Sequence, residues 1–161
     1  MSTPAVVPVY VAAMESAFGA PGQSGFGSAV FYEATIAAAD LERIALEKYR
    51  YFVGDLWERF GEAAWLSTWR LLYTRSDQRR DIASELLAIT DRDARQLAPL
   101  IVDNGSRAAS SREALTAAYD DETVSALRVY RIGDGAALAG LLIAGWRDKR
   151  GRFPHPAAGL M

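Results

Sequence analysis

A row of positions four residues apart, running from residue 57 to residue 73, is dominated by bulky aromatic side chains. It consists of Trp57, Gly61, Trp65, Trp69 and Tyr73, and it holds three of the four tryptophans in the chain. Because an α-helix turns by about 100° per residue, such a row forms one slowly drifting ridge on the helix surface. Burying a large aromatic side chain removes about 150–250 Å² from water, which contributes roughly 4–6 kcal/mol. The segment 55–74 is therefore predicted to be a strongly apolar helix.

The drift of this ridge leaves two interpretations open. Over its length the row swings by about 160° around the helix, so one end can be buried while the other emerges. In the simpler interpretation, the tryptophans belong to the hydrophobic core. The alternative is a partner-binding surface formed by Trp65, Trp69 and Tyr73, because tryptophan and tyrosine are enriched in the hot spots of protein interfaces.

The composition is that of an ordinary globular protein. The chain has 161 residues, of which half are hydrophobic and about a quarter charged, and this length suits one domain over 1–161. The net charge of −2 provides no general attraction to nucleic acid or to an anionic membrane. The absence of cysteine excludes disulfides, thiolate nucleophiles and cysteine-ligated metals. With no signal-peptide pattern and no apolar run long enough to span a bilayer, a cytoplasmic location is expected, and the excess of arginine over lysine suggests a bacterium.

The pattern along the chain predicts an α+β fold. We expect an N-terminal assembly of four to five helices followed by a small antiparallel β-hairpin. The hairpin is predicted because two apolar runs flank the turn Gly133-Asp134-Gly135, although the second run, 136–147, could also be a buried helix. The expected segments are an extended arm with a glycine-rich loop (1–29), the helical part (30–119), the hairpin (120–153) and a loose tail (154–161).

Capping residues predict where several helices begin and end. Gly54 is expected to end one helix, and the sequence Asp55–Glu58 is a capping box for the next. The sequence Thr90-Asp-Arg-Asp93, with acidic residues in the first turn, predicts the start of a later helix, which Pro99 is expected to kink or end.

No motif for catalysis, cofactor binding or metal binding is present. The single histidine, His155, lies between two prolines in the predicted tail, and neither a GxSxG nor a GxxxxGK[ST] pattern occurs. The acidic run 120–122 lacks the spacing of a calcium loop and is interpreted as a solvated junction. We therefore expect no catalytic residue, no cofactor and no metal, and the sequence favours a protein that is not an enzyme.

A basic stretch follows the second apolar run and is flanked by Trp146 and Phe153. Arginine-rich turns beside aromatic residues can grip phosphates and stack bases, although a solvated hairpin turn has the same composition. This basic patch comprises Arg147, Lys149, Arg150 and Arg152.

Three functional hypotheses follow. The abundance of large aromatic residues without catalytic motifs favours a protein-binding module, such as an adaptor, inhibitor, immunity protein or chaperone-like subunit, including self-association. The alternative is a small-molecule-binding or minor enzymatic domain with a pocket between the aromatic helix and the hairpin. Weak nucleic-acid binding through the basic patch is the third, and no membrane partner is expected.

Overall fold

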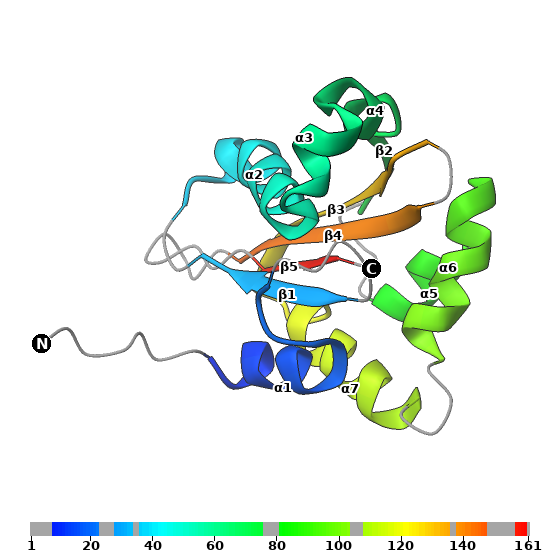
Figure 1. Cartoon of the computed structure of the whole chain (residues 1–161). Coiled ribbons are helices and arrows are strands. Elements are labelled where there is room, and N and C mark those ends of the chain that lie inside the picture. Colours follow the sequence, from blue (N-terminus) through cyan, green and yellow to red (C-terminus); the bar gives the residue numbers. More distant parts are fainter. Residues whose placement is uncertain are drawn as a thin grey trace, which may run out of the picture.

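A five-stranded antiparallel sheet runs through the middle of the molecule, and helices cover both of its faces (Figure 1). This computed structural model describes residues 8–22, 28–33, 36–75, 81–103, 108–135, 138–147 and 157–160. The predicted α+β class is confirmed. The strand order is β1-β5-β4-β3-β2, with the bounds β1 Ala29–Tyr32, β2 Arg70–Thr74, β3 Val124–Gly133, β4 Ala139–Arg147 and β5 Ala157–Leu160.

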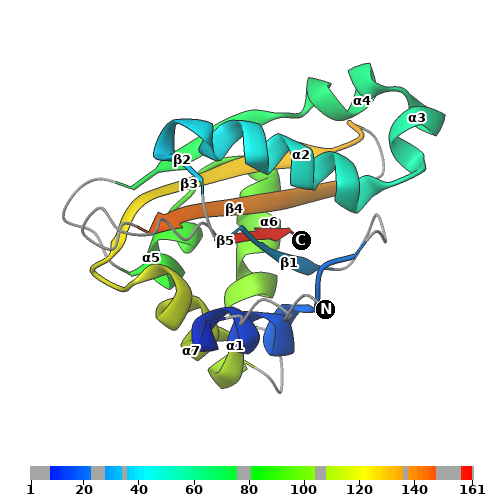
Figure 2. The same ribbon diagram turned by 90° about the vertical axis from the view of Figure 1, so that its left-hand side faces the viewer.

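The helices form two layers, one on each face of the sheet (Figure 2). One layer contains a short 3₁₀ helix (Ala38–Asp40), α2 (Leu41–Val53), α3 (Leu56–Phe60) and α4 (Glu62–Ser67). The other contains α1 (Val9–Phe18), α5 (Ile82–Leu87), α6 (Arg92–Val102) and α7 (Ala108–Tyr119). Two hydrophobic clusters result, and the central strands contribute to both because successive side chains of a strand point to opposite faces.

The predicted hairpin is confirmed, and it forms the centre of the sheet. Residues 139–147 are strand β4, so the alternative of a buried helix is wrong. Leu141 and Ile143 pack on the layer of α1 and α5–α7, whereas Leu142 packs on the layer of α2–α4. A strand that is buried on both faces has a continuous apolar sequence. This explains why the sequence alone left open whether the segment is a strand or a buried helix. Gly133 is needed before the turn, because its φ is +140° and a Cβ there would lie 2.2 Å from the Leu138 carbonyl oxygen.

The prediction of one helix over 55–74 is wrong. The helical segment breaks at Gly61, whose φ of +90° separates α3 from α4, and it ends at Ser67. Residues Arg70–Thr74 form strand β2, which pairs with β3. Glycine reaches this conformation without a steric penalty, and the pairing with β3 supplies backbone hydrogen bonds that replace those of a helix.

Three further boundaries differ from expectation. Within the predicted arm, Val9–Phe18 is helix α1, which begins directly after Pro8. The predicted helical part also contains strands β1 and β2. Residues 157–160 are not a loose tail, because they form strand β5 between β1 and β4. The sequence of β5, Ala-Ala-Gly-Leu, has no alternation of apolar and polar residues that would identify a strand.

Some capping predictions are confirmed and others are wrong. Gly54 ends α2 with a φ of +66°, and Asp91 begins α6 by accepting hydrogen bonds from two backbone N–H groups at 3.0 and 3.2 Å. Asp55 precedes α3, but its side chain accepts no capping hydrogen bond. Pro99 lies inside α6, which continues to Val102 and is followed by a hydrogen bond from the Asp103 N–H to the Pro99 carbonyl oxygen.

Candidate partner-binding surface

Most of the aromatic row lies in the core between α2–α4 and the sheet. The rings of Trp57 and Trp65 are stacked with their centroids 6.2 Å apart, although they belong to two different helices. Trp69, between α4 and β2, stacks on Tyr130 of β3 at 4.3 Å. Trp65 is only 1% exposed, and its Nε1–H donates a hydrogen bond to the Leu56 carbonyl oxygen at 3.0 Å. Trp65 is thus a core residue, and Trp69 is partly buried beside it.

The hydroxyl group of Tyr49 links this aromatic cluster to the hairpin. It lies 2.9 Å from the carbonyl oxygens of both Trp65 and Gly133, and it accepts a hydrogen bond from the Gly133 N–H at 3.0 Å. Burial raises the pKa of Tyr49, so the hydroxyl stays protonated. Its ring also stacks on Trp69 with a centroid distance of 5.7 Å. Side chains therefore fill the space between the aromatic segment and the hairpin, where a small-molecule pocket was predicted.

Replacing Tyr49 with phenylalanine is expected to lower the free energy of unfolding by about 1–3 kcal/mol, because it leaves the buried Gly133 N–H without its acceptor. The carbonyl oxygens of Gly133 and Trp65 keep their hydrogen bonds from the Thr68 hydroxyl. Chemical denaturation followed by circular dichroism measures this loss. Tyr51→Phe is the matched control, since Tyr51 is half exposed and its change should stay within about 0.5 kcal/mol. Equal losses in the two variants would contradict the structural role of the Tyr49 hydroxyl.

Strand β2 forms one outer edge of the sheet, and β3 is its one neighbouring strand among the described residues. The other edge differs, because the N–H of Val30 in β1 donates a hydrogen bond to the Gly19 carbonyl oxygen at 3.1 Å. At the end of β2, the Arg75 N–H donates to the Leu127 carbonyl oxygen of β3 at 3.0 Å. Since backbone groups of a strand point alternately to its two sides, the N–H and C=O of Thr74 face the outer edge. No hydrogen bond from this edge to the described part of the chain is found.

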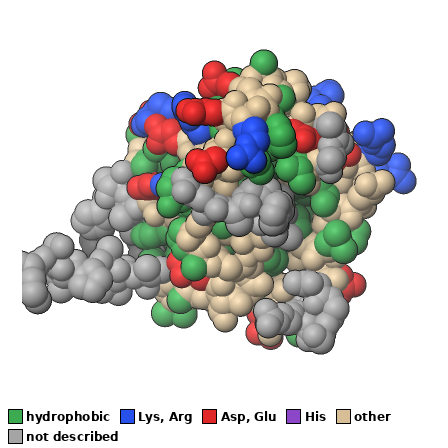
Figure 3. Space-filling view, in the orientation of Figure 1, with side chains coloured by type: hydrophobic (Ala, Val, Ile, Leu, Met, Phe, Trp, Pro, Cys, Tyr) green, Lys and Arg blue, Asp and Glu red, His purple; other side chains and the backbone are tan. Residues whose placement is uncertain are grey.

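Three large hydrophobic side chains of the consecutive elements α3, α4 and β2 are exposed. Phe60, Leu66 and Leu71 are 49%, 41% and 48% exposed, and they belong to α3, α4 and β2. Each is a neighbour of the buried aromatic stack: Phe60 stacks on Trp65 at 5.9 Å, the Leu66 carbonyl accepts the N–H of Trp69, and Leu71 lies across from Tyr130. We call these three side chains together with strand β2 the β2 surface. Figure 3 shows hydrophobic side chains between acidic and basic ones over the upper part of the molecule, where α2–α4 lie.

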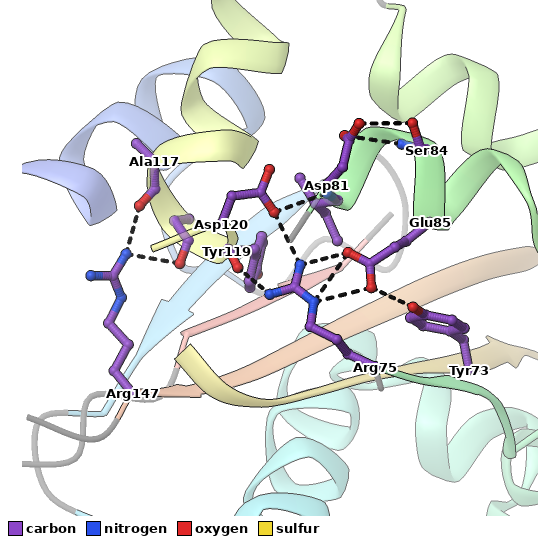
Figure 4. A network of polar contacts seen from close by, with 11 residues as sticks. Tyr73, Arg75, Asp81, Ser84, Glu85, Ala117, Tyr119, Asp120 and Arg147 are labelled. Atoms are coloured by element: carbon purple, nitrogen blue, oxygen red, sulfur yellow. Dashed lines mark hydrogen bonds and ion pairs between the residues drawn. The ribbon is translucent and has the colours of Figure 1, made fainter. Parts of the chain in front are cut away.

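A buried network of charges holds the end of β2 against the helices on the opposite face (Figure 4). The Arg75 guanidinium bonds both carboxylate oxygens of Glu85, at distances from 2.7 to 3.1 Å, and Asp120 at 3.0 Å. It also donates to the Tyr119 carbonyl oxygen, and the Tyr73 hydroxyl donates to Glu85. Burial raises the pKa of Asp120 above its usual range, against the opposing effect of an Ile82 N–H and of Arg75. Tyr73 is thus anchored within this network, and Asp120 is not part of a solvated junction.

The described member of the predicted basic patch also has a structural role. Arg147 is nearly buried and donates hydrogen bonds to the carbonyl oxygens of Ala117 and Ala118 at 2.6 and 2.9 Å, near the C-terminus of α7. Its guanidinium lies over the Tyr10 ring, 3.6 Å from the centroid. A cation is favourable at this end of a helix, because the helix dipole is negative there. Lys149, Arg150, Arg152 and His155 lie outside the described residues.

Other features that would suggest a ligand site are weak. No group of three or more histidine, aspartate or glutamate residues that could hold a metal occurs in the part of the chain that the structure describes. One surface depression of about 560 Å³ lies between α1 and α7, and another of about 410 Å³ lies where α2 meets α3. Among the described residues that line these depressions, no charged side chain is buried. Among the described helices, none is both long and apolar enough to cross a membrane.

Comparisons with known proteins assign no family: no protein-family model, no curated protein and no solved structure matches this chain.

The candidate surface overlaps the predicted partner-binding residues only in part. Of these residues, Trp65 is buried and Trp69 and Tyr73 are partly buried, and the exposed side chains lie at other positions of the same segment, 60–71. Gly61 in the middle of the aromatic row was the one signal of a helix break. Recognising Leu71 as an exposed residue required the pairing of β2 with β3, which no spacing in the sequence indicates.

Proposed function

We propose that this chain is a bacterial cytoplasmic protein that binds another polypeptide through the β2 surface. The observation that carries the proposal is the exposure of Phe60, Leu66 and Leu71, in the two helices that lead into β2 and in β2 itself, an edge strand that is open in the described structure. Covering a large aliphatic or aromatic side chain contributes about 1.5–3 kcal/mol, and these three are each nearly half exposed. A cluster of partly exposed hydrophobic side chains with charged residues around it is typical of a transient protein interface.

The rigidity of this surface supports the proposal. Arg75, Glu85 and Asp120 hold one end of β2, and the stacking of Trp69 on Tyr130 holds the other. A surface that is already ordered loses less conformational entropy when a partner binds. The small-molecule alternative is less well supported, because aromatic side chains and the Tyr49 hydroxyl fill its expected pocket. Nucleic-acid binding would depend on basic residues outside the described part of the chain, since Arg147 is used internally.

Replacing Leu71 with aspartate is expected to weaken partner binding by at least about tenfold, as the loss of a central interface side chain does. The experiment compares the proteins captured from lysate of the source organism by the wild-type chain and by this variant, using quantitative mass spectrometry. The matched control is Leu100→Asp, because Leu100 on α6 is 60% exposed but lies in the other helical layer. Circular dichroism of each variant first establishes that it is folded.

The control makes the outcome specific. A partner that Leu100→Asp retains and Leu71→Asp loses would support binding at the β2 surface. If both variants capture the same proteins as the wild-type chain, or if both lose them equally, the β2 surface is not the binding site.

A further inference from the structure

We infer that the partner binds by adding an extended strand to the outer edge of β2, with an acidic side chain of that strand facing Arg70. This inference rests on the proposed function and specifies the chemistry of the partner. In such strand addition, main-chain hydrogen bonds supply affinity, and the side chains that alternate along the added strand supply specificity.

The backbone of β2 provides the first argument. The hydrogen bond from the Arg75 N–H to Leu127 sets the alternation, and it leaves the N–H and C=O of Thr74 directed away from β3. Thr74 itself is exposed, so an incoming strand can reach this part of the edge. Exposed N–H and C=O groups along an edge strand form a template for another strand.

The charge at the beginning of β2 provides the second argument. Arg70 lies directly across from Arg131, so two positive side chains share one face of the sheet. Asp91 balances Arg131 with a contact of 3.1 Å between Oδ1 and Nη1. Arg70 is exposed and has no ion pair with any residue that the structure describes. A carboxylate from a partner would supply the balancing charge.

The side-chain pattern of β2 extends this requirement to the whole added strand. Leu71 lies across from Tyr130 and therefore faces the layer of α2–α4, whereas Arg70 faces the layer of Asp91. A complementary strand then carries an aliphatic residue on the Leu71 side and an acidic residue on the Arg70 side, in alternation. A second copy of β2 does not meet this requirement, because its sequence Arg-Leu-Leu-Tyr-Thr contains no acidic residue.

The test uses random linear peptides displayed on phage and selected against the full chain. We expect the selected peptides to alternate aliphatic and acidic residues, and their affinities are measured by fluorescence anisotropy with synthetic peptides. Thr74→Pro removes the outward N–H but none of the hydrogen bonds to β3, and it should weaken binding at least tenfold. Arg70→Glu should weaken the binding of acidic peptides by a similar factor. This variant should instead bind peptides that carry lysine in place of the acidic residue, with the affinity restored. For each variant, an unfolding midpoint equal to that of the wild-type chain shows that its fold is intact.

Each outcome is decisive for the strand-addition inference or for the proposed function. If Thr74→Pro and Arg70→Glu bind like the wild-type chain while Leu71→Asp does not, strand addition is wrong and the β2 surface remains a binding site. If Leu71→Asp also binds normally, both strand addition and partner binding at the β2 surface are wrong. Selection of peptides without acidic residues would also contradict the inference that the added strand is acidic. The same holds if light scattering detects concentration-dependent dimers that Thr74→Pro abolishes.

Discussion

Replacing Glu85 with alanine is expected to lower the free energy of unfolding by about 3–5 kcal/mol, the usual effect of removing one partner of a buried ion pair. The side chains of Arg75 and Glu85 are only 5% and 1% exposed, so the variant leaves the guanidinium in a poorly hydrated site with Asp120 as its remaining carboxylate partner. The Tyr73 hydroxyl would also lose its carboxylate acceptor. Urea denaturation followed by circular dichroism measures the change in unfolding free energy.

An exposed ion pair serves as the comparison for Glu85→Ala. Arg43 and Glu47 on α2 are joined at 2.8 Å, and both side chains are more than half exposed. Arg43→Ala should change the free energy of unfolding by less than about 0.5 kcal/mol, because exposed pairs contribute little. If Glu85→Ala destabilises the chain no more than Arg43→Ala does, the network does not anchor β2.

Replacing Trp65 with alanine is expected to lower the free energy of unfolding by about 3–5 kcal/mol, because it opens a cavity in the core. The variant loses the stacking on Trp57 and the hydrogen bond to the Leu56 carbonyl oxygen. Thermal and chemical denaturation measure this effect. Phe60→Ala is the control, since Phe60 stacks on Trp65 but is half exposed, and we expect a loss below about 1.5 kcal/mol.

This comparison also separates the two interpretations of the aromatic row. A Trp65→Ala variant as stable as the wild-type chain, but unable to bind a partner, would contradict the core assignment and support a direct role of Trp65 in binding. A strongly destabilised variant is the result that the buried position of Trp65 predicts.

Turn and capping residues in the sequence predicted correctly those parts of the fold that are determined by residues close together in the chain. The turn at Gly133–Gly135 identified the hairpin, Gly54 identified the end of α2, and the sequence 90–93 identified the start of α6, where Asp91 is the N-cap. The prediction of one helix over 55–74 was wrong because the four-residue spacing of its aromatic side chains has two explanations. Trp57 and Trp65 stack on each other from two short helices, and this arrangement gives the same spacing as a ridge on one helix.

The candidate site depends on tertiary pairing, which spacing alone does not reveal. Arg75 is separated from Glu85 by 10 residues and from Asp120 by 45, and only the folded chain brings the three together. Leu71 becomes an edge residue because β2 pairs with β3, more than fifty positions later in the sequence. The aromatic row therefore indicated the correct region of the chain, whereas the exposed residues there are Phe60, Leu66 and Leu71.

The most direct test of partner binding at the β2 surface is amide hydrogen exchange of the ¹⁵N-labelled chain, measured alone and with a purified partner identified by the Leu71→Asp comparison. Binding at the β2 surface predicts slower exchange within residues 70–74, greatest at Thr74, whose N–H faces the outer edge of the sheet. Protection confined to another surface, such as the depression between α1 and α7, with residues 70–74 unchanged, would contradict it.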